Sequence, residues 1–306
     1  KTGSFKIRGA YYKISQLSEE EQKKGVIACS AGNHAQGVAL GATSMGIKSL
    51  ICLPEGAPIS KVEATKKLGA EVCLVPGVYD DAFQKALQLR DEHGYTFIHP
   101  FDDENVIAGQ GTIGLELLDQ LPDVEAVVVP VGGGGLISGV AYAVKSLNPN
   151  VKVYGVQASG APSMVNSLHD HKQEKLAKVS TIADGIAVKE PGSVTFDICS
   201  RYVDDIVTVS EDEICAAILH LIESEKMVAE GAGAASVAAG VAGTAANIAA
   251  TIDGGLGNSK VARPIVSSPT QADMDKLDAK VGAAPTQQQV ASDLNDMIGD
   301  NAPKKV

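Results

Sequence analysis

The sequence feature that most restricts the fold is an uninterrupted apolar run, residues 126–131, followed directly by four glycines. These glycines are Gly132, Gly133, Gly134 and Gly135. A strand without alternating polar residues is typical of a parallel sheet with helices on both faces. A helical pattern begins near Leu136, so the glycines form a strand-to-helix turn whose free N–H groups suit an anion. We therefore predict an α/β fold in which this turn binds phosphate; an ordinary tight turn is the simpler alternative.

The same alternation of strand and helix extends over most of the chain. Expected strands are 26–30, 49–53, 71–75, 126–131, 151–157 and 205–209. Expected helices are about 33–46, 59–68, 80–93, 106–120, 136–146, 194–202 and 211–228. Pro58 is placed to open one helix, and Gly46, Gly69 and Gly94 are placed to close three others. The pattern predicts parallel-rich sheets flanked by helices.

Length and composition set further limits on fold and partners. The chain has 306 residues, 44% of them hydrophobic, which suits two compact lobes. A net charge of −11 without a basic stripe argues against a nucleic-acid partner. Five cysteines without CxxC spacing suit a reducing compartment, so we expect a cytoplasmic protein. Neither an apolar run of membrane-spanning length nor a signal peptide is found, so no membrane partner is expected.

A lysine near the start of the chain supplies a second chemical element. Lys6 lies in Ser-Phe-Lys-Ile-Arg-Gly-Ala, beside small residues that favour flexible turns. A lysine amine captures an aldehyde as a Schiff base, and pyridoxal 5'-phosphate has both an aldehyde and a phosphate. The alternative is an ordinary surface lysine. Because the chain begins at Lys1, without Met and already inside this motif, we expect a further segment to precede it.

A third small-residue segment, 30–37, favours the cofactor. It reads Ser-Ala-Gly-Asn-His-Ala-Gln-Gly and leads from a strand into a helix whose N-terminus suits a carboxylate. Asn33 could donate a hydrogen bond to a ring hydroxyl, and His34 is either chemical or structural. Two acidic-glycine turns are weaker signals: Asp184-Gly185, and Glu230-Gly231, where Glu230 either binds a substrate group or caps a helix.

Together these motifs resemble the fold-type II pyridoxal-phosphate enzymes, whose fold is like that of the tryptophan synthase β subunit. Five segments occur in the order found in that family. They are the Lys6 segment, residues 30–37, Ala-Gly-Gln-Gly-Thr at 108–112, the four glycines followed by Leu136, and Glu-Gly-Ala-Gly-Ala at 230–234. Within that family the chain is most similar to the threonine ammonia-lyases (threonine dehydratases), especially their short catabolic form. The resemblance extends from Lys1 to about Ala239.

The resemblance implies a role for each motif. Lys6 would be the catalytic residue and form the Schiff base, with Phe5 near the cofactor ring and Asn33 on the phenolic oxygen. The cofactor-binding residues would be Lys6, Phe5, Asn33, Gly132, Gly133, Gly134, Gly135, Gly185 and Asp253, with Asp253 at the pyridine nitrogen. The substrate-binding residues would be Ser30, Ala31, Gly32, His34 and Glu230. A small lobe, 26–105, would be inserted into a large cofactor-binding lobe, 1–25 and 106–265, followed by an atypical, flexible tail, 266–306.

The expected activity is deamination of L-threonine, and also of L-serine, to a 2-oxo acid and ammonia by a homodimer or homotetramer. Serine racemase is an alternative, but racemases have a Ser in place of Ala31 as an acid–base group. They also bind a divalent cation through an acidic residue where this chain has Gln157, so no metal is expected. A non-catalytic protein that binds an amino acid is the third possibility. A C-terminal amino-acid-sensing domain is not visible in the sequence, so feedback by isoleucine is not expected.

Overall fold

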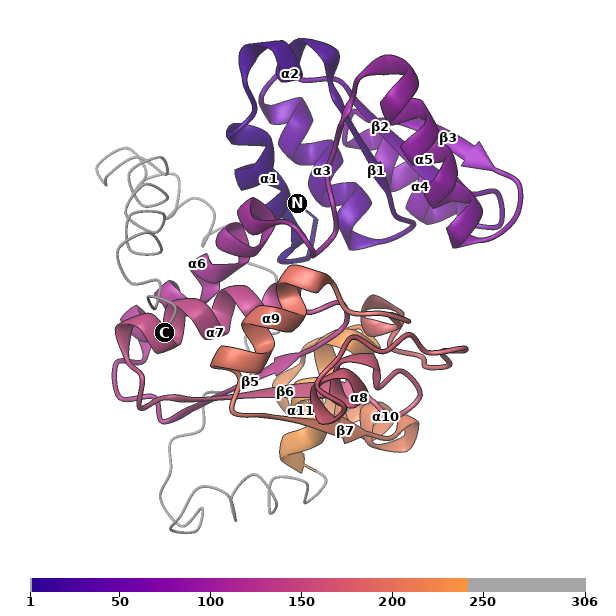
Figure 1. Cartoon of the computed structure of the whole chain (residues 1–306). Coiled ribbons are helices and arrows are strands. Elements are labelled where there is room, and N and C mark those ends of the chain that lie inside the picture. Colours follow the sequence, from indigo (N-terminus) through magenta and orange to yellow (C-terminus); the bar gives the residue numbers. More distant parts are fainter. Residues whose placement is uncertain (1, 242–306) are drawn as a thin grey trace. The chain divides into compact units, whose positions relative to one another are not determined.

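Two parallel sheets organise the computed structural model, which describes residues 2–241 (Figure 1). Residues 5–241 belong to one compact unit. The expected cofactor contact Asp253 and the tail 266–306 lie outside the described residues. Within residues 2–241, no helix combines the length and the apolar character needed to cross a membrane.

The first sheet contains four parallel strands in the order β3–β2–β1–β4. Its strands are β1 (Val26–Cys29), β2 (Ser49–Pro54), β3 (Glu71–Val75) and β4 (Thr96–Phe97). Its connecting helices are α3 (Asn33–Ser44), α4 (Ile59–Lys67) and α5 (Tyr79–His93). Every residue of β1 is buried, as its unbroken apolar sequence requires.

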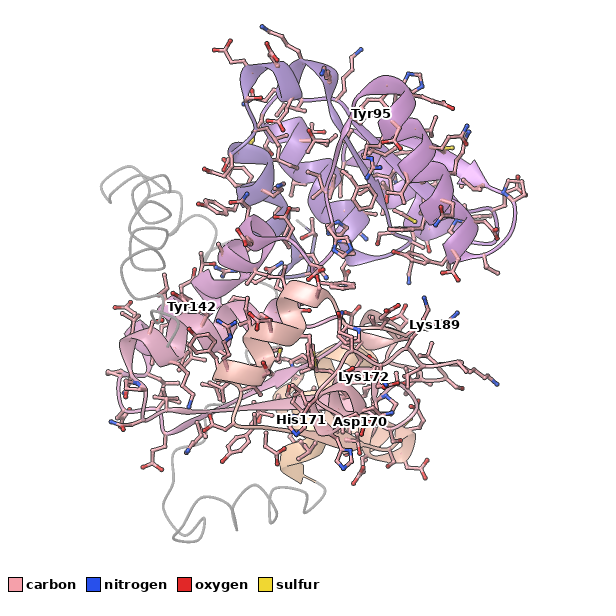
Figure 2. The ribbon with its side chains drawn as sticks, in the orientation of Figure 1. Tyr95, Tyr142, Asp170, His171, Lys172 and Lys189 are labelled. Atoms are coloured by element: carbon pink, nitrogen blue, oxygen red, sulfur yellow. The ribbon has the colours of Figure 1, made fainter. Side chains whose placement is uncertain are left out.

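The second sheet contains three parallel strands in the order β5–β6–β7. Its strands are β5 (Ala126–Pro130), β6 (Lys152–Ala158) and β7 (Asp205–Val209). The helices of this region are α6 (Glu104–Gln120), α7 (Gly135–Leu147), α8 (Ser163–His169), α9 (Ser193–Tyr202), α10 (Glu211–His220) and α11 (Gly231–Val241). Helices α7 and α9 contact each other through Tyr142 of α7, which is labelled in Figure 2, and Tyr202 of α9. The two rings pack edge to face, with their centroids 5.2 Å apart.

The predicted α/β class and parallel pairing are confirmed, and the expected strands and helices, apart from helix 211–228, are found with boundaries shifted by at most two residues. The helix-ending role of Gly46, Gly69 and Gly94 is also confirmed, since their φ angles are 69°, 96° and 71°. Pro58 directly precedes α4, as expected. The division into a small lobe, 26–105, and a large lobe stays a prediction.

Other sequence-based expectations were wrong or incomplete. The predicted helix 211–228 ends earlier, as α10 followed by a π-helical turn, Leu221–Glu225, because Lys226 adopts a left-handed φ of 57°. Lys6, expected beside small residues that favour flexible turns, is the first residue of a helix, α1 (Lys6–Ser15), that was not predicted. Also unexpected are α2 (Glu19–Lys24), β4, α8 and α11.

Helix α1, which contains Lys6, contacts both α3 and α6. The approach of α6 depends on the absence of side chains: a Cβ on Gly109 would lie 2.6 Å from the Cα of Gly9 and 2.7 Å from the Arg8 carbonyl oxygen. These neighbours are backbone atoms, which have little freedom to move aside. The position of the Lys6 helix is therefore set by backbone-to-backbone packing.

Replacing Gly109 with Ala should separate α1 from α6 and destabilise the protein by about 1–3 kcal/mol, the usual cost of overpacking a core. Gly56→Ala is the matched control, because a Cβ at Gly56 would meet no atom within 4 Å. Denaturant unfolding of the two variants measures the difference. Equal stability of both variants would show that the α1–α6 contact can relax freely.

Candidate functional site

The amine of Lys6 is held by the segment that follows β4. Its Nζ donates a hydrogen bond of 2.7 Å to the carbonyl oxygen of Pro100 and lies 5.5 Å from the centroid of the Phe5 ring. Desolvation lowers the pKa of the Lys6 ammonium from 10.5 to about 8, and the negative charge of Glu230 opposes part of this change. A neutral amine is a nucleophile and a base, so this position suits both kinds of chemistry.

Helix α3 reaches the backbone of Lys6 through Gly37, where a Cβ would lie 3.0 Å from the carbonyl carbon and oxygen of Lys6. In the first turn of α3, His34 is buried, and its Nε2 lies 2.8 Å from the Ile98 carbonyl oxygen, which can only accept a hydrogen bond. Burial, with the nearby charge of Lys6, lowers the pKa of His34 from 6.5 to about 3. The ring is therefore neutral, and the geometry favours the structural interpretation of His34 over the expected contact with substrate.

Three of the expected site residues, from separate segments, lie close together near Lys6. The Asn33 side-chain amide donates a 2.8 Å hydrogen bond to Oε1 of Glu230, the residue that precedes α11. The same oxygen would lie 3.4 Å from a Cβ placed on Gly185, in the short 3₁₀ helix Asp184–Ile186. The Glu230 carboxylate thus has a partner in Asn33, which favours a site role over a helix cap.

The turn between β1 and α3 offers backbone donors next to open space. Gly32 donates its N–H to the Ser30 hydroxyl at 3.1 Å, and a Cβ on Gly32 would meet no described atom within 4 Å. The first N–H groups of a helix lack acceptors within it, so the start of α3 suits a carboxylate. Ala31 is half-buried and packs partly against the core that covers the first sheet.

Three of the four glycines have no room for a side chain, and the first has little. A Cβ on Gly133 would lie 2.5 Å from ring atoms of Phe101, and one on Gly135 would lie 2.8 Å from the Phe101 Cα. At Gly134 it would lie 2.7 Å from Met164 and Thr195, and Gly134 has a φ of 98°, which favours glycine. A Cβ on Gly132 would lie 3.1 Å from the Ile186 Cα, beside the Gly185 segment.

The donors of this turn fit a phosphate. Helix α7 starts at Gly135, so the first N–H groups of the helix point out of its end. In residues 2–241, the N–H groups of Gly133, Gly134 and Gly135 donate to no backbone carbonyl. A turn without side chains, with unpaired donors at the end of a buried strand, is the arrangement that a phosphate cradle needs.

Sequence reasoning missed the residues that position this site. Pro100 and Phe101 contact Lys6 and Gly133, and the Asp102 carboxylate accepts hydrogen bonds from the first N–H groups of α9. Each partner is tens of residues away in the sequence, so no local spacing marks these positions. Pro and Asp in a loop are ordinary turn signals by themselves.

Gln157, where the resemblance suggests a lost metal ligand, is fully buried and cross-links two segments. Its amide donates to the Val131 carbonyl at 3.2 Å and accepts from the Val165 N–H at 2.9 Å. Both ends of the amide therefore have partners. Among residues 2–241 no group of three or more His, Cys, Asp or Glu is arranged to hold a metal ion, and the expected absence of a metal stays a prediction.

Comparison with known proteins adds an independent line of evidence. A family model described as "Pyridoxal-phosphate dependent enzyme" matches residues 1–257. L-threonine ammonia-lyase of Thermotoga maritima is 59% identical over 239 residues, which are 78% of this chain and 60% of that protein. L-threonine dehydratase catabolic TdcB of Escherichia coli is 50% identical over 78% of this chain and 73% of its own length.

The fold is also similar to solved structures. The processed form of threonine deaminase isoform 2 from Solanum lycopersicum superposes with a TM-score of 0.81 and 41% sequence identity, over 92% of this chain and 80% of that chain. The chain thus spans three fifths of the length of its Thermotoga relative and about three quarters of that of its Escherichia relative.

The lowered pKa of Lys6 can be measured without a cofactor. Acetic anhydride acylates neutral amines, so Lys6 should become reactive with a midpoint near pH 8, whereas a lysine in water titrates near pH 10.4. At pH 7 about one tenth of the Lys6 amine is neutral, compared with about one in 2,500 for a lysine in water. Competitive labelling followed by peptide mass spectrometry gives the rate at each pH.

Lys23, whose side chain is 77% exposed, is the internal standard for the amount of active reagent at each pH. The reactivity of Lys6 relative to Lys23 should fall as the pH is raised from 8 to 10, because the neutral fraction of Lys6 can rise only about twofold over this range, whereas that of a lysine in water rises many-fold. A relative reactivity that does not change over this range would contradict the lowered pKa.

Proposed function

Because this chain belongs to the family of pyridoxal-phosphate-dependent enzymes, we propose that it is a lyase that deaminates L-threonine, and also L-serine. The products are 2-oxobutanoate or pyruvate, and ammonia. The observation that carries the proposal is the Lys6 amine, which has a pKa lowered to about 8 and lies near the Glu230 carboxylate. The relatives named as threonine ammonia-lyase and threonine dehydratase support the choice of substrate.

When bound, pyridoxal 5'-phosphate supplies an aldehyde that captures amines and a conjugated ring that delocalises negative charge. Lys6 would hold the aldehyde between turnovers and, once released by the substrate amine, take up the substrate's α-proton. Its lowered pKa favours this step because the free amine is already neutral in a substantial fraction of molecules near pH 8. The Pro100 carbonyl keeps the amine at this place.

The remaining residues would bind and orient. The backbone donors of residues 132–135 would hold the phosphate, and the Ser30–Gly32 turn with the N-terminus of α3 would hold the substrate carboxylate. Asn33 would donate to the cofactor's phenolic oxygen through the second N–H of its amide, since only one N–H is used in the bond to Glu230. Glu230 would accept a hydrogen bond from the substrate's hydroxyl or ammonium group.

The wider organisation of the protein is part of the same proposal. Residues 1–25 and 106–265 would form the cofactor-binding lobe around an inserted lobe, 26–105, and Asp253 would meet the pyridine nitrogen. The resemblance to the threonine ammonia-lyases supports a homodimer or homotetramer. Five free cysteines support a reducing compartment such as the cytoplasm.

Replacing Lys6 with Ala tests the central assignment. The variant should lose the visible absorption band of the lysine-linked cofactor, and 2-oxobutanoate formation from L-threonine should fall by several orders of magnitude, because anchor and base are removed together. Lys23→Ala, at an exposed position, is the control that should keep both. Near-normal deamination by Lys6→Ala would overturn the assignment.

Ala31 distinguishes the lyase from a serine racemase. A methyl group has no proton to give, so the unmodified protein should convert L-serine to pyruvate without appreciable D-serine. Ala31→Ser adds a hydroxyl at the turn, and D-serine formation should rise by about tenfold or more, since a well-placed general acid contributes about 10²–10⁴-fold. Chiral chromatography of serine after partial turnover measures it.

Ala31→Val is the matched control, because it also enlarges the side chain but adds no hydroxyl. D-serine from Ala31→Val at the level of Ala31→Ser would mean that bulk, not the hydroxyl, changes the outcome. Abundant D-serine from the unmodified protein would favour the racemase.

A further inference from the structure

The carbonyl of Gly133 is held from outside the glycine turn. The hydroxyl of Thr195, in the first turn of α9, donates a 2.6 Å hydrogen bond to this oxygen. The N–H of Gly192 donates to the same oxygen at 3.3 Å. Thr195 is fully buried, so its hydroxyl has no water to satisfy it and the bond to Gly133 is strongly favoured. Two donors from one segment thus fix the direction of one carbonyl.

The direction of that carbonyl decides the direction of the next N–H. In a trans peptide the C=O of Gly133 and the N–H of Gly134 point to opposite sides. With the oxygen held towards α9, the N–H of Gly134 is turned away from α9, where no described backbone carbonyl accepts it. The φ of 98° at Gly134 belongs to this orientation. Rotating the peptide by half a turn would exchange the two groups and present an oxygen in place of the donor.

An anion distinguishes these two orientations sharply. A phosphate is stabilised by an N–H directed at it and repelled by a carbonyl oxygen at the same place. We propose that Thr195 is a positioning residue, which selects the orientation of the Gly133–Gly134 peptide that offers its N–H to the phosphate. The inference rests on the proposed function in one respect, the binding of the cofactor phosphate by residues 132–135.

The position of Thr195 is itself fixed by contacts from two other segments. Asp102 accepts hydrogen bonds from the backbone N–H groups of Ser193 at 3.0 Å, Val194 at 2.9 Å and Thr195 at 3.2 Å. This carboxylate provides the helix cap that Gly192 cannot provide. In addition, the Ser138 hydroxyl of α7 donates to the Thr195 carbonyl at 3.3 Å. The helix that follows the glycines and the helix that orients them are therefore joined.

Close packing leaves the Thr195 hydroxyl little freedom. A Cβ on Gly134 would lie 2.7 Å from the Thr195 Cβ and 2.9 Å from its Oγ1, so the side chain lies directly against the turn. Its hydroxyl also lies 3.2 Å from the Gly192 carbonyl, but the bond to Gly133 is shorter. Removing the hydroxyl while keeping the shape of the side chain should therefore affect only the peptide orientation.

Thr195→Val tests this, with Thr195→Ser as the matched control that keeps the hydroxyl. The apo forms are titrated with pyridoxal 5'-phosphate and, separately, with pyridoxal, which has the aldehyde but no phosphate. Thr195→Val should bind pyridoxal 5'-phosphate about tenfold more weakly, the effect of one buried hydrogen bond. Its affinity for pyridoxal should stay unchanged, and Thr195→Ser should bind both compounds like the unmodified protein.

An unchanged affinity of Thr195→Val for pyridoxal 5'-phosphate would overturn the inference, and so would an equal loss for both compounds, which indicates a general disturbance. If Thr195→Val does not fold, Thr195→Ala compared with Thr195→Ser gives the same contrast. Failure of the proposed function would be seen separately, as an unmodified protein that binds the cofactor but does not deaminate threonine. In that case the affinities of the variants for pyridoxal 5'-phosphate and for pyridoxal would still test the role of Thr195. An unmodified protein that binds both compounds equally would overturn the phosphate site and the inference with it.

Discussion

The candidate site depends on one short connection, residues 98–102, which leads from β4 to α6. Backbone carbonyls of this segment hold the amine of Lys6 and the imidazole of His34. An aromatic ring of the same segment lies against Gly133, and a carboxylate caps α9. Because these contacts come from five consecutive residues, the amine, the glycine turn and α9 are positioned by a single piece of backbone. A shift of that piece would move all three together.

Burial sets the charge of the groups around this connection. Desolvation lowers the pKa of both Lys6 and His34. At Lys6 the negative charge of Glu230 opposes part of this change, whereas at His34 the positive charge of Lys6 adds to it. Lys6 therefore titrates near pH 8, and His34 is neutral at neutral pH because its pKa is about 3. Near neutral pH the Lys6 amine can therefore exchange a proton, whereas the His34 ring is not protonated.

Small residues let backbone atoms do the positioning. At Gly109 helix α6 approaches the backbone of α1 more closely than a side chain would allow, and at Gly37 helix α3 leaves space for only a tight Cβ contact. The glycine turn before α7 also lets neighbouring atoms pack closely against the backbone. Its conformational freedom, however, has to be restricted by contacts from elsewhere in the fold. A four-glycine segment has many accessible conformations, and ordering it costs conformational entropy. The contacts from Thr195, Gly192 and Phe101 supply that order from outside the turn.

Local patterns in the sequence were sufficient for the parallel strands, for the helices between them and for the small-residue turns, because strand burial and helix ends depend on neighbouring residues. They failed for β4, which has only two residues, and for α1, whose helix is stabilised by contacts with α3 and α6. The roles of Pro100, Asp102 and Thr195 depended on tertiary structure alone. Their partners lie 62 to 94 residues away, and whether a loop carbonyl or a helix hydroxyl meets a given group is decided by how the sheets and helices pack.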